Sequence, residues 1–393
     1  MKEEKEKIIT ELSGLDRRAA LGFSYFKKIG SKRWRLLTDN FPDLTTAFNA
    51  SAPELMKAGL KKSLTEEFIN WRKSFLAERE LKQLAEEKIS FTTWHDNDYP
   101  PAFKTITDAP PLIYYRGEIK LLNRGVNDCL AVVGSRQHSA YGAQTIKMLI
   151  PDIAKIEIKI ISGLALGIDT LAHQAALKNG ITVAVLGSGL AKNCIYPAQN
   201  RRLAEEILNK GGILISEFPP DTPPLRQNFP RRNRLISGLA KVTLVIEASE
   251  KSGALTTAHY AKLQNRELLV IPGAISSKFS RGTNQLIKDG GRIVSSTQDI
   301  INFFSSNSAQ TFSRTSLAKK VPSLQQFTTL NKEEEIVYCL IKQASEQGQT
   351  VSTDKIARDS QLDTATINSK LSILELAGRI RLKGAGYELN III

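Results

Sequence analysis

Cysteine is scarce in this sequence. Only Cys129, Cys194 and Cys339 occur in 393 residues, far apart and without a CxxC pair. An odd number of widely spaced cysteines argues against a disulfide framework or a thiolate zinc site. This usage fits the reducing cytoplasm, so a cytoplasmic location is expected.

Long apolar runs are also missing. No segment approaches the roughly 20 continuous apolar residues of a membrane helix, so no membrane insertion is expected. The start of the chain, MKEEKEKIITEL, mixes both charge signs and lacks the apolar region of a secretory signal. The hydrophobic fraction of 41% and charged fraction of 24% are typical of soluble globular proteins.

Catalytic motifs are few. His95, His138, His173 and His259 show no metal-ligand spacing, and each is better interpreted as structural. The sequence contains no GxxxxGK[ST] loop, no GxGxxG at the first strand–helix turn and no GxSxG elbow. We therefore expect a binding protein without metal or cofactor, rather than an enzyme.

Positive charge is plentiful and unevenly distributed. The chain has 54 Lys and Arg against 40 Asp and Glu, a net charge of +14. Residues 91–330 hold 28 basic and 17 acidic side chains, a net +11, whereas residues 331–393 hold 8 and 9, a net −1. The middle of the chain is thus the expected site for a polyanion, although a solvated basic surface without a partner explains charge alone equally well.

Residues 1–90 are expected to form a helical domain. An amphipathic stretch runs from Gly14 to Gly30, and Ser31 is the predicted N-cap of the next helix. The segment KKIGSKRWRLL resembles a helix-hairpin-helix turn, whose backbone amides can approach a phosphate, which suggests a SAM or helix-hairpin-helix type of domain. Ordinary helical packing explains the same residues.

From Cys129 the pattern changes to short apolar runs separated by helical stretches. The runs are CLAVVG (129–134), IKIISG (158–163), TVAVLG (182–187), GILISE (212–217), VTLVIEA (242–248) and ELLVIPG (267–273). Runs that are apolar throughout are typical of strands buried on both faces of a parallel sheet. Alternating with helices, they predict an α/β fold: a Rossmann-like, doubly wound, mostly parallel sheet over residues 91–304.

The C-terminal third is predicted to contain a linker and a small domain. Residues 305–330 are rich in Ser, Thr and Gln and are interpreted as the linker. Residues 331–393 suggest three helices and a hairpin around Gly384–Gly386, the pattern of a winged helix. The net charge of −1 on this domain matches duplex DNA poorly, so a role in contacting another protein is at least as favoured as DNA binding.

Four predicted strand ends are rich in Gly and Ser and precede helices. They are VVGSRQHSAYG (132–142), ISGLALGIDTLAH (161–173), EKSGALTTA (250–258) and SRGTNQLI (280–287). Helix N-termini offer free N–H groups to anions, so loops converging on one edge of the sheet predict a phosphate-binding crevice. Asp169 and Asn284 are equally well placed simply to cap helices.

A fifth segment combines an aromatic ring with arginines. DTPPLRQNFPRRNRLISGLA (221–240) places Phe229 among Arg226, Arg231, Arg232 and Arg234. Guanidinium groups bind phosphates and a ring stacks on a base, so this composition favours single-stranded nucleic acid. In the alternative, Phe229 is a hydrophobic staple and the arginines are solvated, with Arg234 turned inward to a carboxylate such as that of Glu247 or Glu217.

The order of these motifs resembles the DprA/Smf (DNA-processing) family over residues 90–300. VVGSR, ISGLALGIDTLAH, TVAVLGSGL…IYPAQN, GILISEFPP, FPRRNRLISGLA, IEASEKSGALTTA and PG…S-GTN-LI follow one another as in that family. The resemblance implies a protein that binds single-stranded DNA, commonly as a homodimer. It also implies protection of incoming DNA during natural transformation and loading of a RecA-type recombinase.

The resemblance also implies roles for particular residues. The family's phosphate-contacting arginine falls on Arg136, its basic residue before the FxxRNR-like motif on Arg226, and its base-stacking aromatic on Phe229. Motif and resemblance together give the expected DNA-binding residues as Gly134, Ser135, Arg136, Ser162, Gly163, Arg226, Phe229, Arg232, Asn233, Ser252, Gly253, Gly282, Thr283 and Asn284.

Parts of the sequence also suggest two other classes of function. Rossmann-like N-glycosidases that process nucleotides carry a PGGxGTxxE-like site, but here Leu286 stands where that motif places its glutamate. The carboxylate needed at the glycosidic bond is therefore missing from that position. A winged-helix transcription regulator with a ligand domain would prefer duplex sequences, against which the −1 charge of residues 331–393 argues.

Overall fold

The computed structural model describes residues 14–304, 332–347, 349–360 and, with gaps, 362–389. The chain divides into two compact units, Met1–Ser308 and Ala309–Ile393, each of which is described by itself. The predicted linker, residues 305–330, lies outside the described residues.

The N-terminal region is helical, as its sequence indicates. Its helices are α1 (Gly14–Tyr25), α2 (Ser31–Asn40), α3 (Leu44–Asn49), α4 (Ala52–Lys57), α5 (Lys62–Arg72) and α6 (Ala77–Glu86). Stacked and edge-on aromatic rings form their core, with Phe23 in contact with Trp34, Phe48 and Phe68. The prediction that Ser31 caps α2 is wrong, because the N-cap is Gly30, which has no side chain to accept a hydrogen bond.

These helices share a hydrophobic cluster with the sheet that follows. The hydroxyl of Ser24 lies 2.5 Å from that of Tyr114, and Arg17 pairs with Asp96 at 3.2 Å. The predicted boundary at residue 90 coincides with the start of the first strand, Ser90. A separate domain over residues 1–90 stays a prediction.

The sheet has nine strands in the order β1-β2-β6-β5-β4-β3-β7-β8-β9. From β6 to β9 all neighbours are parallel, while β1 and β2 form an antiparallel edge. The strands are β1 (Ser90–Thr93), β2 (Leu112–Arg116), β3 (Cys129–Val133), β4 (Lys159–Ser162), β5 (Thr182–Val185), β6 (Ile213–Ser216), β7 (Val242–Val245), β8 (Glu267–Val270) and β9 (Arg292–Ile293). All six predicted apolar runs are confirmed as strands.

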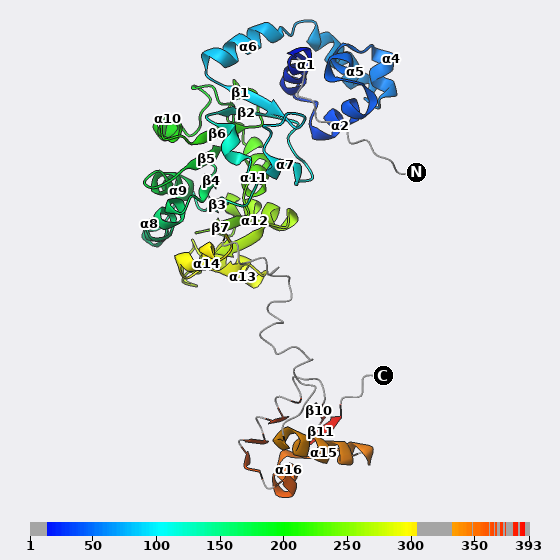
Figure 1. The fold of residues 1–393 in the computed structure, drawn as a ribbon, viewed down its shortest axis with the longest axis vertical. Coiled ribbons are helices and arrows are strands. Elements are labelled where there is room, and N and C mark those ends of the chain that lie inside the picture. Colours follow the sequence, from blue (N-terminus) through cyan, green and yellow to red (C-terminus); the bar gives the residue numbers. More distant parts are fainter. Residues whose placement is uncertain are drawn as a thin grey trace. The chain divides into compact units, whose positions relative to one another are not determined.

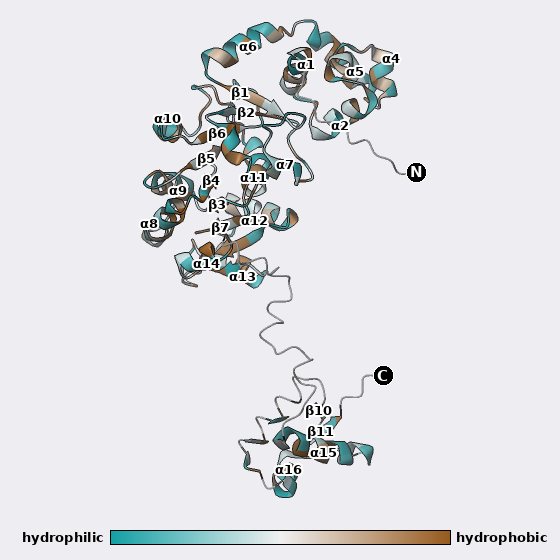
Figure 2. Cartoon of the chain, viewed as in Figure 1, coloured by the Kyte–Doolittle hydropathy of each residue, from teal (hydrophilic) through white to brown (hydrophobic). Residues whose placement is uncertain are grey.

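Helices cover both faces of this sheet, as Figure 1 shows, so the prediction of a doubly wound fold is confirmed. One face carries α8 (Ala140–Lys155), α9 (Ile168–Ala176), α10 (Arg201–Asn209) and α14 (Thr297–Ile301). The other carries α7 (Pro101–Lys104), α11 (Asn228–Gly238), α12 (Gly253–Leu263), α13 (Arg281–Lys288) and the short helix η1 (Ile119–Leu122). A second short helix, η2 (Ala198–Asn200), precedes α10. Figure 2 shows that these helices carry both apolar and polar residues.

Among the described residues, none of the helices is long and apolar enough to cross a membrane.

The C-terminal unit is a winged helix, as predicted. It contains α15 (Lys332–Glu346), α16 (Thr353–Ser360) and the antiparallel hairpin β10 (Ile380–Lys383) and β11 (Gly386–Leu389). The described residues between 364 and 374 are also helical, where the third helix is expected. A small apolar core that includes Val337, Ile356 and Leu371 holds these elements together.

Candidate nucleic-acid interface

A large cavity lies where the strand order of the sheet reverses. Strand β3 pairs with β4 on one side and with β7 on the other, so the chain winds away from β3 in both directions. Loops at the carboxyl ends of such strands diverge and leave room for a ligand. Here the loops enclose a cavity of about 860 Å³, which we call the crevice. It is lined by residues that follow β3, β4 and β7 and by residues at the start of α11.

The loop after β3 forms one wall of the crevice. A Cβ atom on Gly134 would lie 2.6 Å from the Ile168 side chain, so no larger residue fits between this turn and α9. Arg136 is exposed and lines the cavity. The following helix begins at Ala140 with Ser139 as its cap, so Arg136 lies before the helix rather than at its start.

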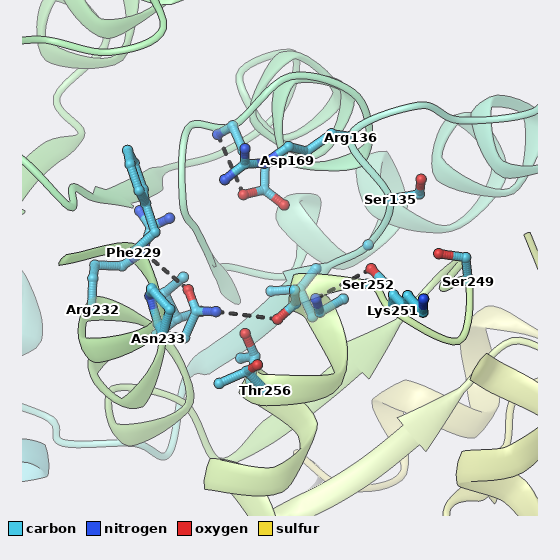
Figure 3. Close-up of a pocket in the computed structure, with 18 of the residues that line it drawn as sticks. Ser135, Arg136, Asp169, Phe229, Arg232, Asn233, Ser249, Lys251, Ser252 and Thr256 are labelled. Carbon is cyan, nitrogen blue, oxygen red and sulfur yellow. Dashed lines mark hydrogen bonds between the residues drawn. The ribbon is translucent and has the colours of Figure 1, made fainter. Parts of the chain in front are cut away.

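The first turn of α11 places an aromatic ring inside the crevice. Phe229 is half-buried and its ring lies over Gly187, where a Cβ atom would approach the ring to 2.8 Å. The guanidinium carbons of Arg136 and Arg232 lie 5.5 and 6.0 Å from the ring centroid, within cation–π range. The ring of Tyr196 lies 5.8 Å away, tilted by 52°. Figure 3 shows Phe229 and Arg136 facing the same space.

Arg232 is buried, unlike Arg136, and organises the floor of the crevice. Only 3% of it is exposed, and its guanidinium donates to the carbonyl of Gly163 at 2.7 Å and to that of Val185. Burial lowers the pKa of Arg232 to about 10, against the opposing effect of the Asp169 carboxylate. The strand ends of β4 and β5 are therefore tied to α11 by one side chain.

Asp169 faces this guanidinium from the start of α9. Its carboxylate accepts hydrogen bonds from the N–H groups of Gly163 at 3.1 Å and Ala165 at 3.4 Å. Burial raises the pKa of Asp169, although Arg232 and the N–H donors oppose the rise. The N-cap of α9 is Gly167, so the prediction that Asp169 caps this helix is wrong.

The opposite wall is the N-terminus of α12. Ser252 caps this helix by accepting from the N–H of Ala254, and Asn233 of α11 donates to the carbonyl of Gly253 at 3.2 Å. Lys251 is exposed beside the cap and lines the cavity. The lining is strongly cationic: it contains Arg136, Arg232 and Lys251, which Figure 3 labels, and Arg226, against the single carboxyl group of Asp169.

Comparisons with known proteins agree with this geometry. A sequence model of the family described as DNA recombination-mediator protein A matches residues 90–305, and one for the DprA winged helix domain matches residues 330–386. The chain belongs to the DNA recombination-mediator protein A family, DprA/Smf.

Individual relatives support the same assignment. Protein Smf of Escherichia coli K12 is 47% identical over 204 residues, 52% of this chain and 53% of that protein, so the match spans about half of this relative. DNA processing protein DprA of Streptococcus pneumoniae is 42% identical over 210 residues, 53% of this chain and 72% of that protein. The X-ray structure of DNA processing protein A from Streptococcus pneumoniae superposes with a TM-score of 0.63 at 31% identity, covering 75% of this chain and 99% of that chain.

Within this family fold, most of the expected site residues line the crevice. The structure brings together Gly134, Ser135, Arg136, Arg226, Phe229, Arg232, Asn233, Ser252 and Gly253. Ser162 is fully buried and donates its hydroxyl to the carbonyl of Val132, and the backbone of Gly163 is engaged by Arg232 and Asp169. These two residues therefore lie beneath the crevice.

The fourth glycine-rich loop is not part of the crevice lining. Gly282 packs on the carbonyl of Ser249, and Thr283 is buried and donates to the carbonyl of Ser280. The Asn284 side chain donates to the carbonyl of Gly273 at 3.0 Å and accepts from its N–H at 3.4 Å. The cap of α13 is Ser280, so the prediction that Asn284 caps a helix is also wrong.

The crevice lining also contains residues outside the predicted set, among them the aromatic Tyr196 and the cationic Lys251. Tyr196 lies in the IYPAQN motif and Lys251 in the EKSGALTTA motif. An aromatic ring and a cation inside these family motifs were the features of the sequence that could have identified them. The predicted inward turn of Arg234 is confirmed, since it pairs with Glu217 at 2.5 Å. The other candidate partner, Glu247, instead accepts from Ser139.

The residues expected for the N-glycosidase alternative do not come together in the described part of the chain. Leu286 packs into a hydrophobic cluster at 8% exposure, so the position of the N-glycosidase glutamate carries an apolar side chain. Glu217 is paired with Arg234 and does not line the crevice. Among the described residues, no group of three or more His, Cys, Asp or Glu side chains could hold a metal ion.

Proposed function

We propose that the crevice binds a single strand of DNA with little regard to its sequence. The observation that carries this proposal is the position of Phe229, a half-buried ring flanked by two guanidinium groups inside a cationic cavity. Arg136, Arg226 and Lys251 would bind successive phosphates, while the rings of Phe229 and Tyr196 stack on a base. Every base has a π-face, so such stacking tolerates any sequence.

The geometry favours single strands over duplexes. Bases in a duplex are stacked on each other and paired, and a ring recessed in a cavity cannot reach their faces. The N–H groups at the start of α12 add an electropositive end to the phosphate path. We infer that Arg232 supports the ring and the loops from below rather than contacting the strand, because it is buried and its Nη1 donates to two carbonyls.

The wider role follows the family and is part of the same proposal. We infer a DNA-processing protein of the cytoplasm that protects incoming single strands during natural transformation and loads a RecA-type recombinase onto them, without catalysing a reaction. We further infer a homodimer, as the family resemblance implies. Sedimentation at several concentrations tests the dimer, and strand exchange on DNA coated with single-strand-binding protein tests the loading.

Removing the outer cations should abolish most of the DNA affinity. Arg136→Ala combined with Arg226→Ala deletes two phosphate contacts, so binding of labelled oligo-dT should fall strongly at physiological salt. The slope of log affinity against log salt should become shallower by about 1.4, or 0.7 for each contact. A competition between single-stranded and duplex DNA, followed by fluorescence anisotropy, measures both affinity and strand preference.

A charge-matched control separates the site from bulk electrostatics. Lys155 and Arg202 are exposed on α8 and α10 and are not part of the crevice lining. The variant Lys155→Ala with Arg202→Ala lowers the net charge equally and should leave binding nearly unchanged. Equal losses in the two double variants, or a wild-type preference for duplex DNA, would refute the proposal.

A further inference from the structure

A second, smaller cavity lies between the N-terminal helices and the sheet. It encloses about 250 Å³ and is bounded by the α1–α2 turn, by the segment before β2 and by residues 217–231. Asn228 lines this cavity, whereas its neighbour Phe229 lines the crevice. The first turn of α11 therefore separates the two cavities, and a strand leaving the crevice would cross only about one helix diameter, roughly 10 Å, to reach the second.

Three residues of this cavity carry buried polar atoms without hydrogen-bond partners. Within the described part of the chain, the indole N–H of Trp34, the side-chain N–H₂ of Asn228 and one carboxylate oxygen of Glu217 lack a partner. Trp34 is 1% exposed and Asn228 is 4% exposed. Buried polar groups are almost always paired, so three exceptions around one cavity point to an absent ligand.

The chemistry of these atoms suits the edge of a nucleobase. Two N–H donors and one carboxylate acceptor require a planar group that carries acceptors and a donor side by side, as each nucleobase does. The second carboxylate oxygen of Glu217 is already held by Arg234, which it shares with Asp108, so the Glu217 charge is partly offset. The ring of Trp34 is fixed by edge contacts with Phe23 and Trp94, which keeps the indole in place.

The mouth of the cavity suits a phosphate. Gly30 and Ser31 line it at the start of α2, a helix of ten residues whose first turn has no side-chain cap. The free N–H groups of such a turn attract an anion. Lys27 and Arg231 are exposed and also line the cavity, so two cations flank this helix terminus.

We propose that the same DNA strand continues from the crevice into this second cavity. One nucleotide lies there, with its base toward Trp34, Asn228 and Glu217 and its phosphate near the start of α2, between Lys27 and Arg231. The inference rests on the proposed function, and it makes the N-terminal helices part of the DNA site. A strand must then be long enough to leave the crevice before the second cavity contributes.

Oligonucleotide length therefore tests the inference. The full chain is titrated with labelled oligo-dT of about 5 and about 15 nucleotides, near the limits of known single-strand site sizes. Lys27→Ala with Arg231→Ala should weaken the long oligonucleotide roughly tenfold, as for the loss of one nucleotide's contacts, and make its salt slope shallower by about 1.4. Binding of the short oligonucleotide should not change, which also shows that the variant is folded.

A control variant and a second readout sharpen the result. Lys57, at the end of α4, and Lys61, the N-cap residue of α5, are exposed and do not line the cavity, so Lys57→Ala with Lys61→Ala should affect neither length. A photoreactive thiothymidine placed along the long oligonucleotide should crosslink to the peptide that contains Trp34. Trp34→Phe, which removes the indole N–H donor together with part of a fully buried ring, should reduce long-strand affinity, and unchanged binding of the short oligonucleotide shows that this variant is folded.

The outcomes are distinguishable. If the wild type binds neither length, the proposed function itself fails. A second outcome is that Lys27→Ala with Arg231→Ala weakens both oligonucleotides equally, or neither, while Arg136→Ala with Arg226→Ala still abolishes binding. In that case the crevice binds DNA and the second cavity is not on the DNA path. The inference is also overturned if the protein binds thymidine monophosphate and Trp34→Phe weakens that binding without changing the affinity for long DNA.

Discussion

The loops after β3 and β8 both place glycine and hydroxyl side chains between a strand and a helix, but their surroundings differ. Gly134 and Ser135 line the open crevice, whereas the loop from Gly273 to Asn284 is closed on itself by the two hydrogen bonds of the Asn284 side chain. Strand β3 lies at the reversal of strand order, while β8 lies between β7 and β9, its nearest neighbours in sequence. Sheet order, rather than loop composition, decides which strand end is open to a ligand.

The largest expected effect comes from the side chain that supports the open loops. Arg232→Ala leaves the carbonyls of Gly163 and Val185 unpaired and the buried Asp169 without its cation. Leaving a buried charge without compensation typically costs about 3–5 kcal/mol, so the free energy of unfolding should fall by about that amount. Urea denaturation measures it, and DNA affinity should fall as well, because the Phe229 ring loses its neighbour.

Three further variants test how far the floor of the crevice depends on these two charges. Arg232→Lys keeps the charge but loses the planar guanidinium, including the Nε–H that donates to Asn233 at 3.2 Å, so it should be intermediate. Asp169→Asn removes the unpaired carboxylate, so Arg232→Ala combined with Asp169→Asn should be less destabilised than the sum of the single variants. Strict additivity would mean that the floor of the crevice does not depend on this pair.

A smaller effect, confined to binding, is expected for the aromatic ring. Phe229→Ala removes the stacking surface, which contributes about 1–3 kcal/mol per base, so affinity for oligo-dT should fall by that amount. The salt slope should stay nearly constant, because stacking releases no counterions. Phe229→Trp should retain most of the affinity, and a changed salt slope in Phe229→Ala would show that the ring acts by positioning Arg136.

Much of the fold could be predicted from the sequence because the central strands are apolar on both faces. The antiparallel β1 and β2 and the two-residue β9 were missed, since short edge strands such as SFTT and RI carry no such pattern. The winged helix was recognised from its helices and hairpin.

Most residues of the site could be predicted from the sequence, but not which of them are buried. Arg136, Arg226 and Arg232 look alike in sequence, and only packing shows that the third is buried among carbonyls. Likewise, composition could not separate the loop at Gly134 from the one at Gly282, because the distinction arises from the order of strands in the sheet. Trp34 and Asn228, far apart in sequence, gave no sign that they would line one cavity.

A matched pair of asparagines tests the contrast between open and closed loops most finely. Asn284 fixes the β8 loop through Gly273, and Asn233 reaches across the crevice to the carbonyl of Gly253. Asn284→Ala should lower the free energy of unfolding by about 1–2 kcal/mol, as for two lost hydrogen bonds, with DNA affinity unchanged. Asn233→Ala, at a half-buried position that lines the crevice, should change stability less and weaken oligo-dT binding measurably. Thermal unfolding and anisotropy titrations of both variants are sufficient: if Asn284→Ala weakens DNA binding as much as Asn233→Ala does, the β8 loop contributes to the DNA site and the distinction between the two strand ends does not hold.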